Sequence, residues 1–517
     1  MRYNINMRRL IQILTSRIVI LAILVLLQIS LLFIWIYRAA LYYSIIPMFD
    51  ILARILAVYV VNKEEDSQYK IAWIFLILAL PVLGSLLFLL CFGRKMPKRL
   101  AKGTIEADSR LKDLLTQDED ALNLLKEENP ENFHHFNFGI TVSGYPVYGN
   151  TDAVYYESGE EFLPALLDAL KQAKQFIFLE YYIIQTGGTM WNQILEILKQ
   201  KVREGVEVKI VYDDFGCYTR MPRHYEKTLN QLGIETYRFN RMRPALLIKM
   251  NNRDHRKLCI IDNKIGFTGG VNIADEYINK IHPYGYWRDS AVRIEGDAVT
   301  GMTIMFLGMF SYLRRDEKGI DYTRYIQRHE VEHQPGCWFQ PFSDTPTDEV
   351  DAGLNVHLNL VSSARKYVYI DTPYLVLNSD MISALCLAAR NGTDVRIMTP
   401  HMPDKQIVFQ ITRSNYRKLI EAGVRIYEYI PGFNHRKNIV ADDSMCLIGT
   451  INTDYRSYYL QFEDGVLMRS PKLAETMRLS FENGLKNAKE ITMEECMKTH
   501  PAVRLYRAIM ALVAPLF

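Results

Sequence analysis

The sequence predicts an α/β protein built from two similar repeats, packed as a pseudo-two-fold pair and preceded by an N-terminal transmembrane helical region. Three observations predict this. A His-x-Lys-x4-Asp motif occurs twice, at His255 and at His435. Short runs typical of β-strands alternate with helical stretches before each copy. The first hundred residues are far more apolar than the rest of the chain.

The N-terminal hundred residues contain two stretches long and apolar enough to be transmembrane helices, at about 18–37 and 71–92. The segment between them, 44–61, is also apolar but contains Pro47, Asp50 and Arg54, which indicates an interfacial or re-entrant segment. Arginines and lysines flank the pair on its outer sides. The positive-inside bias therefore predicts a multi-pass cell-membrane protein whose remaining domains, 133–517, lie on the cytoplasmic side.

The remainder of the chain divides into a linker and two repeats. Residues 1–95 are expected to form the membrane anchor and 96–132 a charged linker with a short helix. Repeat 1 is expected over 133–335, and repeat 2, ending in an amphipathic C-terminal tail, over 336–517. In each repeat β-rich runs end in the motif, for example "FIFLEYYII" and "REGVEVKIVYDD" before "DHRKLCIID". This alternation predicts a mixed, mostly parallel sheet in each repeat.

The composition narrows the class of function. The chain has 517 residues, of which 49% are hydrophobic and 23% charged, and its net charge is only +3. A balanced charge without a long basic stripe argues against nucleic acid as a partner. The seven cysteines are scattered, odd in number and never spaced as CxxC, so they indicate free thiols in a reducing compartment.

The repeated motif carries groups suited to an anionic phosphate. In a strand, residues two apart point to the same side, so His255 and Lys257 are expected to share one face. His435 and Lys437 repeat this arrangement. Asn272 and Asn452 follow glycine-containing turns that let the backbone approach a ligand closely. Lysines supply charge and asparagines supply oriented donors, so Lys257, Asn272, Lys437 and Asn452 are the predicted phosphate-binding residues.

Two imidazoles beside two ammonium groups suit covalent phosphoryl transfer. One histidine attacks the phosphorus, the other protonates the departing alcohol, and the roles reverse for a second alcohol. No convincing metal cluster accompanies the motif, so we expect neither a metal nor another cofactor. Asp262 and Asp442, the last residues of the two motifs, belong to the predicted catalytic set His255, Lys257, Asp262, His435, Lys437 and Asp442. Their role is expected to be support of the strand and turn.

The paired motifs, with "GGVN" and "GTIN" downstream, resemble the phospholipase D superfamily. The stretches "GTINTDYRSYYLQFE" and "KIAWIFLILALPVLGSLLFLLCFGR" are similar to those of bacterial cardiolipin synthases in particular. The resemblance covers nearly the whole chain. It implies a membrane phosphatidyltransferase that converts two phosphatidylglycerols into cardiolipin and glycerol through a phosphatidyl-histidine intermediate, with His255 favoured as the nucleophile.

The resemblance also implies an acidic residue that orients each histidine. Asp289 and Glu463 lie at the expected places, and Asp289 is the expected partner of His255. The integral membrane protein would act on phosphatidylglycerol and membrane lipids; the motifs leave its oligomeric state open. A phospholipase D-type hydrolase or another phosphatidyltransferase of the superfamily stays open as an alternative. A tethered nuclease fits the balanced charge less well, and a non-catalytic lipid scaffold has no need of two histidines.

Overall fold

The structure is a computed structural model of the 517-residue chain, and it describes residues 25–31, 33, 45–91, 96–241, 252–315, 321–328, 331–348 and 350–516. The described residues fall into two compact units. One unit contains the N-terminal helices and the end of the chain from Leu505. The other contains residues 98–241 and 252–504, and therefore includes both copies of the motif.

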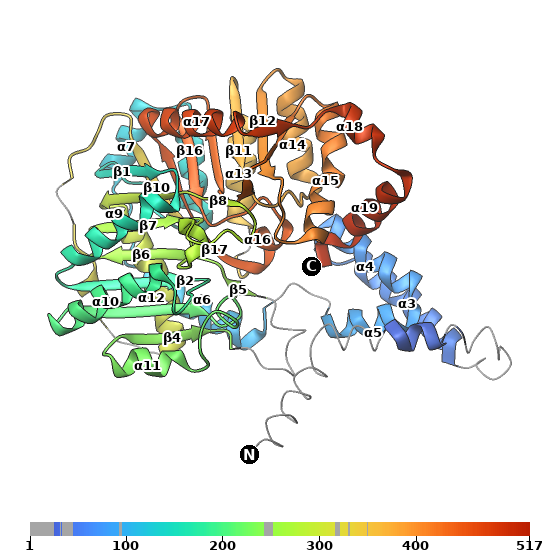
Figure 1. The fold of residues 1–517 in the computed structure, drawn as a ribbon, viewed down its shortest axis with the longest axis horizontal. Coiled ribbons are helices and arrows are strands. Elements are labelled where there is room, and N and C mark those ends of the chain that lie inside the picture. The colour runs from blue at the N-terminus through green and yellow to red at the C-terminus, as the bar shows by residue number, and fades with distance from the viewer. Residues whose placement is uncertain are drawn as a thin grey trace, which may run out of the picture. The chain divides into compact units, whose positions relative to one another are not determined.

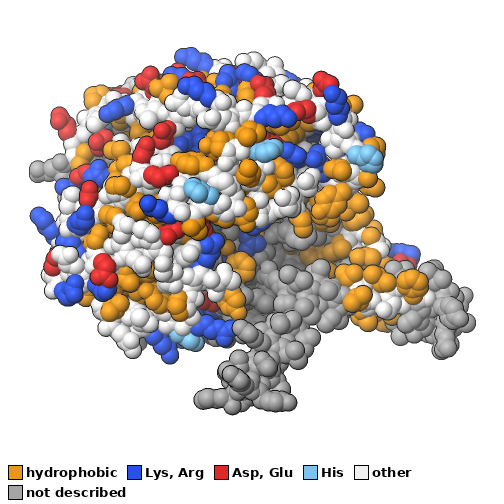
Figure 2. All heavy atoms as spheres, in the orientation of Figure 1, with side chains coloured by type: hydrophobic (Ala, Val, Ile, Leu, Met, Phe, Trp, Pro, Cys, Tyr) orange, Lys and Arg blue, Asp and Glu red, His pale blue; other side chains and the backbone are white. Residues whose placement is uncertain are grey.

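Three helices make up most of the described N-terminal unit: α3 (Ile45–Val61), α4 (Ser67–Ala79) and α5 (Pro81–Cys91). Their exposed side chains are largely apolar, as the orange surface of this region shows in Figure 2. Each helix packs against the other two. Within the part of the chain that the structure describes, no helix combines the length and the hydropathy needed to cross a bilayer.

The segment predicted as one transmembrane helix, 71–92, is divided between α4 and α5. Pro81 lacks an N–H and disfavours helical backbone at the preceding Leu80, whose φ and ψ are −132° and 72°. Gly84 then lies so close to α4 that an added Cβ would be 2.2 Å from the carbonyl oxygen of Leu76. The predicted helix at 18–37 lies mostly outside the described residues. Within it, the structure describes residues 25–31 as helical.

The segment expected to be a charged linker forms helices α6 (Lys98–Lys112) and α7 (Glu119–Glu128), which belong to the same unit as the repeats. Asp118 begins α7 by accepting hydrogen bonds from the backbone N–H groups of Asp120 and Ala121. At the other end of the chain, α18 (Met493–Lys498) precedes the amphipathic helix α19 (Pro501–Val513).

Each repeat contains one mixed sheet flanked by helices (Figure 1). The first sheet has the order β1-β9-β7-β6-β2-β3-β4, and the second β10-β17-β16-β15-β11-β12-β13-β18. The strands of the first sheet are β1 (Thr151–Tyr156), β2 (Phe176–Tyr181), β3 (Glu207–Asp213), β4 (Glu235–Phe239), β6 (Lys257–Ile261), β7 (Ile265–Gly269) and β9 (Ala291–Gly296). Those of the second are β10 (Trp338–Asp344), β11 (Tyr367–Asp371), β12 (Asp394–Pro400), β13 (Arg425–Tyr429), β15 (Asn438–Ala441), β16 (Met445–Gly449), β17 (Gln461–Arg469) and β18 (Ala488–Glu490).

The helices of each repeat alternate along the chain with its strands. The first repeat contains α8 (Phe133–Phe138), α9 (Gly159–Gln172), α10 (Thr189–Arg203), α11 (Tyr225–Gln231) and α12 (Val299–Arg314). The second contains α13 (Ala352–Ser363), α14 (Ser379–Arg390), α15 (Gln406–Glu421), α16 (Tyr455–Leu460) and α17 (Pro471–Leu485).

The sheets are mixed, as predicted, but the expectation of mostly parallel pairing is wrong. Among the described strands in the two orders given above, the parallel pairs are β2 with β3 and β3 with β4 in the first sheet, and β11 with β12 and β12 with β13 in the second. The other pairs within these two sheets are antiparallel, among them the motif strand and the next strand, which a three-residue turn connects in each repeat. Asp262 and Asn263 both have φ of 54° there, which is the backbone of a tight hairpin turn.

The two repeats are joined by short parallel strand pairs that lie immediately before the catalytic candidates. Strand β5 (Arg253–Asp254) pairs with the start of β17, so Asp254 lies opposite Phe462. Strand β14 (Gly432–Asn434) pairs with β8 (Tyr286–Arg288), so Asn434 lies opposite Arg288. These two pairings are reciprocal, as the predicted pseudo-two-fold arrangement of the repeats would require.

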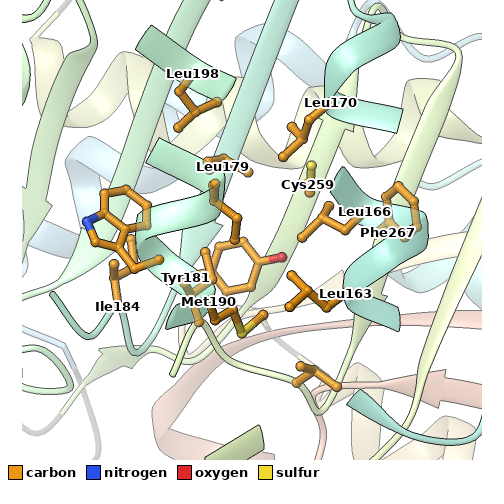
Figure 3. Packing of buried hydrophobic residues seen from close by; sticks show 14 of the residues in the cluster. Leu163, Leu166, Leu170, Leu179, Tyr181, Ile184, Met190, Leu198, Cys259 and Phe267 are labelled. Atoms are coloured by element: carbon orange, nitrogen blue, oxygen red, sulfur yellow. The ribbon is translucent and has the colours of Figure 1, made fainter. Parts of the chain in front are cut away.

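Apolar side chains between the first sheet and its helices hold the motif strand in place. Leu163, Leu166 and Leu170 of α9 face Leu179 of β2 and Cys259 of β6 (Figure 3). All five are buried. Removing one such leucine typically costs ~2–5 kcal/mol, so this packing fixes the strand that carries Lys257.

Candidate active site

Each motif histidine is bonded to a carboxylate from the other repeat. Nδ1 of His255 lies 2.9 and 3.0 Å from the two carboxylate oxygens of Glu463. Nδ1 of His435 lies 2.6 Å from Oδ2 of Asp289. All four side chains are buried, the histidines with 7% of their surface exposed. The structure therefore brings the four predicted residues together.

The expectation that Asp289 is the partner of His255 is wrong. The strand pairs between the repeats explain the crossed arrangement. The backbone N–H of His255 donates to the carbonyl of Phe462, so that the next residue, Glu463, meets the imidazole of His255. The N–H of His435 likewise donates to the carbonyl of Arg288, beside Asp289. Sequence offsets within one repeat cannot reveal a contact that the other repeat supplies.

The two carboxylates are held by different local chemistry. Glu463 accepts hydrogen bonds from the hydroxyls of Thr450 (2.5 Å) and Ser457 (2.7 Å). Asp289 accepts one from the backbone N–H of Ser290. Gly270 occupies the position that Thr450 has in the second repeat, and a Cβ there would lie 1.9 Å from Oδ1 of Asp289. Repeat 1 thus needs a glycine to admit its carboxylate, whereas repeat 2 uses a hydroxyl to orient one.

The motif lysines lie beside the backbone of their own histidines. The ammonium groups of Lys257 and Lys437 donate to the carbonyl oxygens of His255 and His435. Burial lowers the pKa of Lys257 to about 8 and that of Lys437 to about 7, although nearby carboxylates favour the charged forms. Two buried ammonium groups in reach of both imidazoles suit a bound phosphate anion.

The pKa values of both imidazoles are lowered, which favours their neutral form in the absence of a bound phosphate anion. Burial is the main cause of their lowered pKa values, and the charges of Lys257 and Lys437 act in the same direction on each ring. A neutral imidazole beside a carboxylate places its proton on Nδ1, which leaves the Nε2 lone pair free. That is the tautomer a nucleophile or a general base requires.

The predicted phosphate-binding asparagines occupy equivalent positions but differ in their contacts. Oδ1 of Asn272 accepts from the backbone N–H of Ile183, and its amide donates to the hydroxyl of Tyr277 at 2.7 Å. Asn452 is 4% exposed, and its Oδ1 has no hydrogen-bond partner among the described residues. This oxygen is an acceptor, so it suits a donor group such as a hydroxyl of the substrate rather than a phosphate oxygen.

The last motif residues, Asp262 and Asp442, lie at the far ends of their strands and do not contact the histidines. Asp262 accepts hydrogen bonds from three consecutive backbone N–H groups, those of residues 174–176, at 2.7–2.8 Å. Asp442 does the same for residues 365–367, at 2.7–2.9 Å. Each carboxylate therefore ties its turn to the start of the neighbouring strand, as a structural role requires.

Comparison with known proteins decides the family. A family model described as "Cardiolipin synthase, PLD-like domain" matches residues 166–289 and 358–485, and one described as "Phospholipase_D-nuclease N-terminal" matches 51–93. A cardiolipin synthase of Staphylococcus aureus is 32% identical over 90% of this chain and 95% of its own length. This chain belongs to the cardiolipin synthase family of the phospholipase D superfamily.

Other relatives agree with that assignment. Cardiolipin synthase 2 of Bacillus anthracis is 31% identical over 90% of both chains. An uncharacterized protein of Streptococcus mutans is 38% identical over 89% of this chain and 98% of its own. The crystal structure of phosphatidylserine synthase from Haemophilus influenzae shares the fold, with a TM-score of 0.56 at 15% identity, and covers 74% of this chain and 99% of that one.

The structure adds residues to this cardiolipin synthase-family site that the motif analysis missed. Tyr277 and Ser457 each follow a motif asparagine by five residues, a repeated spacing that could have identified both. Tyr277, Trp287 and Phe433 surround His435 with ring centroids 5.3–5.7 Å away, whereas Tyr182 lies 5.0 Å from His255. The two histidines therefore occupy unlike surroundings, which equal motifs could not indicate.

Metal binding was not expected from the sequence. Among the described residues no group of three or more histidine, cysteine, aspartate or glutamate side chains is arranged to hold a metal ion. The carboxylates of Asp289 and Glu463, which contact the motif histidines, are hydrogen-bonded to Nδ1 of His435 and of His255. Metal-independent chemistry stays a prediction, and a chelator tests it by leaving turnover unchanged.

Proposed function

We propose that the protein is a cardiolipin synthase that converts two phosphatidylglycerol molecules into cardiolipin and glycerol. The observation that carries the proposal is the pair of buried imidazoles, each with a cross-repeat carboxylate on Nδ1, beside two buried lysines. The names of the relatives support the choice of substrate. Acceptor choice does not follow from the motif residues.

The first half of the reaction forms a covalent intermediate. Nε2 of neutral His255 attacks the phosphorus of one phosphatidylglycerol, while His435, protonated on Nε2 and with its charge balanced by Asp289, donates that proton to the headgroup oxygen as its bond to phosphorus breaks. Glycerol leaves, and the phosphatidyl group stays on His255. Lys257 and Lys437, with Asn272 and Asn452, stabilise the charge that develops on the phosphoryl oxygens.

The second half reverses these roles. His435 accepts the proton from a hydroxyl of a second phosphatidylglycerol as that oxygen attacks phosphorus. The phosphorus–nitrogen bond breaks, cardiolipin forms and His255 is restored. Glu463 and Asp289 keep the Nδ1 protons in place and stabilise whichever ring becomes charged.

Association with the membrane completes the proposal, because both substrates are lipids. The N-terminal unit exposes apolar side chains that a bilayer would cover, as would part of α19. The six cysteines that the structure describes are free, which accords with the cytoplasmic side. The exposed apolar side chains are Met48, Ile51, Ile55, Val58, Tyr59, Ile71, Phe75, Leu78, Leu89, Leu90, Leu505 and Ile509.

Labelled phosphatidylglycerol supplied to the detergent-solubilised protein tests the reaction. Cardiolipin and glycerol in equal amounts are expected. Phosphatidic acid as the sole lipid product would instead identify a hydrolase. Cardiolipin formation that stops in the presence of a chelator would contradict the metal-independent mechanism.

A substrate with a good leaving group tests the roles of the two histidines. Phosphatidyl-p-nitrophenol needs no general acid for its first step, so H435A is expected to release a burst of p-nitrophenol and to retain a phosphatidyl group on His255. H255A is expected to release none. A burst from H255A and none from H435A would identify His435 as the nucleophile and His255 as the general acid.

A further inference from the structure

The proposed reaction brings two negatively charged phosphates close together, and the site described so far accounts for one of them. The acceptor phosphatidylglycerol carries its own phosphodiester only a few bonds from the attacking hydroxyl. Two like charges at short range repel strongly where water is scarce. A hydrolase faces no such repulsion, since its acceptor is water. A cation for the second phosphate would therefore distinguish a lipid-to-lipid transferase.

Lys405 lies at the edge of the site on the second repeat, directly before α15. Its Nζ is 3.1 Å from the hydroxyl of Tyr374 and 4.7 Å from the centre of that ring. The ring centroid of Tyr374 lies 6.3 Å from that of Phe433, and the ring centroid of Phe433 lies 5.7 Å from that of His435. The Lys405 side chain is 60% exposed and its Nζ lies 3.7 Å from Oδ2 of Asp404, so a phosphodiester that enters from solvent or membrane can reach this ammonium group in competition with that ion pair.

Arg456 supplies a second cation from the same side. The residues after Tyr374 pair with the residues before Arg456: Val376 bridges Asp454, and the N–H of Val376 donates to the carbonyl of Thr453. Arg456 follows on α16, one residue before the serine that holds Glu463. After burial and the two motif lysines, the charges of Lys405 and Arg456 are the next contributors to the lowered pKa of His255.

Neither Lys405 nor Arg456 belongs to the duplicated set of motif histidines, lysines and asparagines. Glu276 occupies the position in the first repeat that Arg456 has in the second, four residues after the motif asparagine. That glutamate is buried and paired with Arg220 at 2.9 Å. The second repeat therefore has an arginine where the first has a glutamate, a difference that the symmetric phosphoryl-transfer site does not explain.

We infer that Lys405 and Arg456 form a subsite for the phosphodiester of the acceptor lipid, separate from the lysine pair that binds the reacting phosphate. The inference rests on the proposed function and specifies its second half-reaction. The subsite neutralises the acceptor and places its free hydroxyl toward the phosphatidyl-histidine. It makes phosphatidylglycerol a better acceptor than an alcohol without phosphate.

Two assays on the same full-length protein separate the subsites. Cardiolipin formation needs both phosphates. Exchange of labelled glycerol into phosphatidylglycerol needs only the reacting phosphate, and it must accompany any mechanism in which glycerol leaves a phosphatidyl-enzyme reversibly. K405M is expected to lower cardiolipin formation ~10-fold more than glycerol exchange, chiefly by raising the KM for the acceptor. K171M is the matched control, because Lys171 is 59% exposed and lies on α9.

Because Arg456 is less exposed, R456M is compared with R456K, which keeps the charge and is expected to recover cardiolipin formation in part. Equal losses in both assays would overturn the inference by assigning the cations to the donor lipid. No loss in either assay would overturn it as well. Failure of the wild-type protein to form cardiolipin while it still exchanges glycerol would instead contradict the proposed function.

Discussion

The carboxylate of Glu463 lies 2.9 Å from Nδ1 of His255, although 208 residues separate them and they belong to different repeats. Asp289 and His435 form the reciprocal contact, 2.6 Å long. Each carboxylate fixes the tautomer of the histidine opposite it. E463Q and D289N are therefore expected to lower kcat by ~10²–10⁴-fold without unfolding the protein, as loss of a histidine-orienting carboxylate does elsewhere.

The crossed pairing itself is visible to NMR of histidine-labelled protein. E463Q is expected to shift the ring resonances of His255 more than those of His435, and D289N is expected to do the reverse. H255A and H435A assign the two signals. Larger shifts of the histidine in the same repeat as the mutated carboxylate would contradict the structure.

The hydroxyl of Thr450 offers a finer test of the same contact. T450V removes the hydrogen bond to Glu463 while it keeps the side-chain shape, and it is expected to lower kcat ~10-fold. T450S keeps the hydroxyl and is expected to stay within about twofold of wild type. Melting temperatures of both variants separate a loss of orientation from a loss of stability. Equal activity of the valine and serine variants would mean that this hydroxyl does not orient Glu463.

The pKa values of the site predict a narrow pH optimum near neutrality. Burial lowers the pKa values of Lys437 and Lys257 to about 7 and 8, so phosphate binding weakens as pH rises through this range. Burial raises the pKa values of Glu463 to about 7 and of Asp289 to about 6, so the Nδ1 acceptors are lost as pH falls through that range. We expect a bell-shaped profile of kcat/KM.

A bound phosphate anion favours charged lysines, so the alkaline limb of kcat is expected at higher pH than that of kcat/KM. Initial rates between pH 5 and pH 10, measured at low and at saturating lipid, separate the two limbs. A kcat/KM that stays constant up to pH 9 would show that deprotonation of these lysines does not limit substrate binding.

Asp262 and Asp442 are expected to affect stability rather than chemistry. Each accepts three backbone hydrogen bonds, so D262A and D442A are expected to lower the free energy of unfolding by ~2–3 kcal/mol. Asp262 has a φ of 54°, which asparagine also tolerates, so D262N serves as the milder control. Activity per folded molecule, measured below the melting temperature, should stay close to wild type. A loss comparable to that of H255A would assign these aspartates to the chemistry.

Much of the site could be predicted from the sequence because the motif occurs twice. Duplication identified His255, Lys257, His435 and Lys437, and the glycine-containing turns identified the asparagines. The pairing of carboxylates with histidines could not be predicted, since the strand pairs that set it connect different repeats. Lys405 and Arg456 have no counterpart at equal spacing, so periodicity could not indicate them.

The fold was predicted at the level of repeats and mixed sheets but not of strand direction. The alternation of helices and strands correctly indicated the parallel core β2-β3-β4 and its counterpart. It did not indicate that Asp262 and Asn263 belong to a three-residue hairpin turn, which makes the motif strand antiparallel to its successor. In the N-terminal unit, average hydropathy concealed the helix break that Pro81 imposes.

The exchange of carboxylates between repeats constrains how such a chain can evolve. A solitary repeat holds a histidine and a carboxylate that do not serve one another, so it could function only by meeting a second copy of itself. Once the two copies are fused, a mutation in one half is felt by the histidine of the other. The longer Glu463 with Thr450 and the shorter Asp289 with Gly270 are two co-adapted sets, and neither could be transplanted without its partners. The two repeats can therefore diverge in their lipid contacts, but neither can be lost or replaced without disabling the histidine of the other.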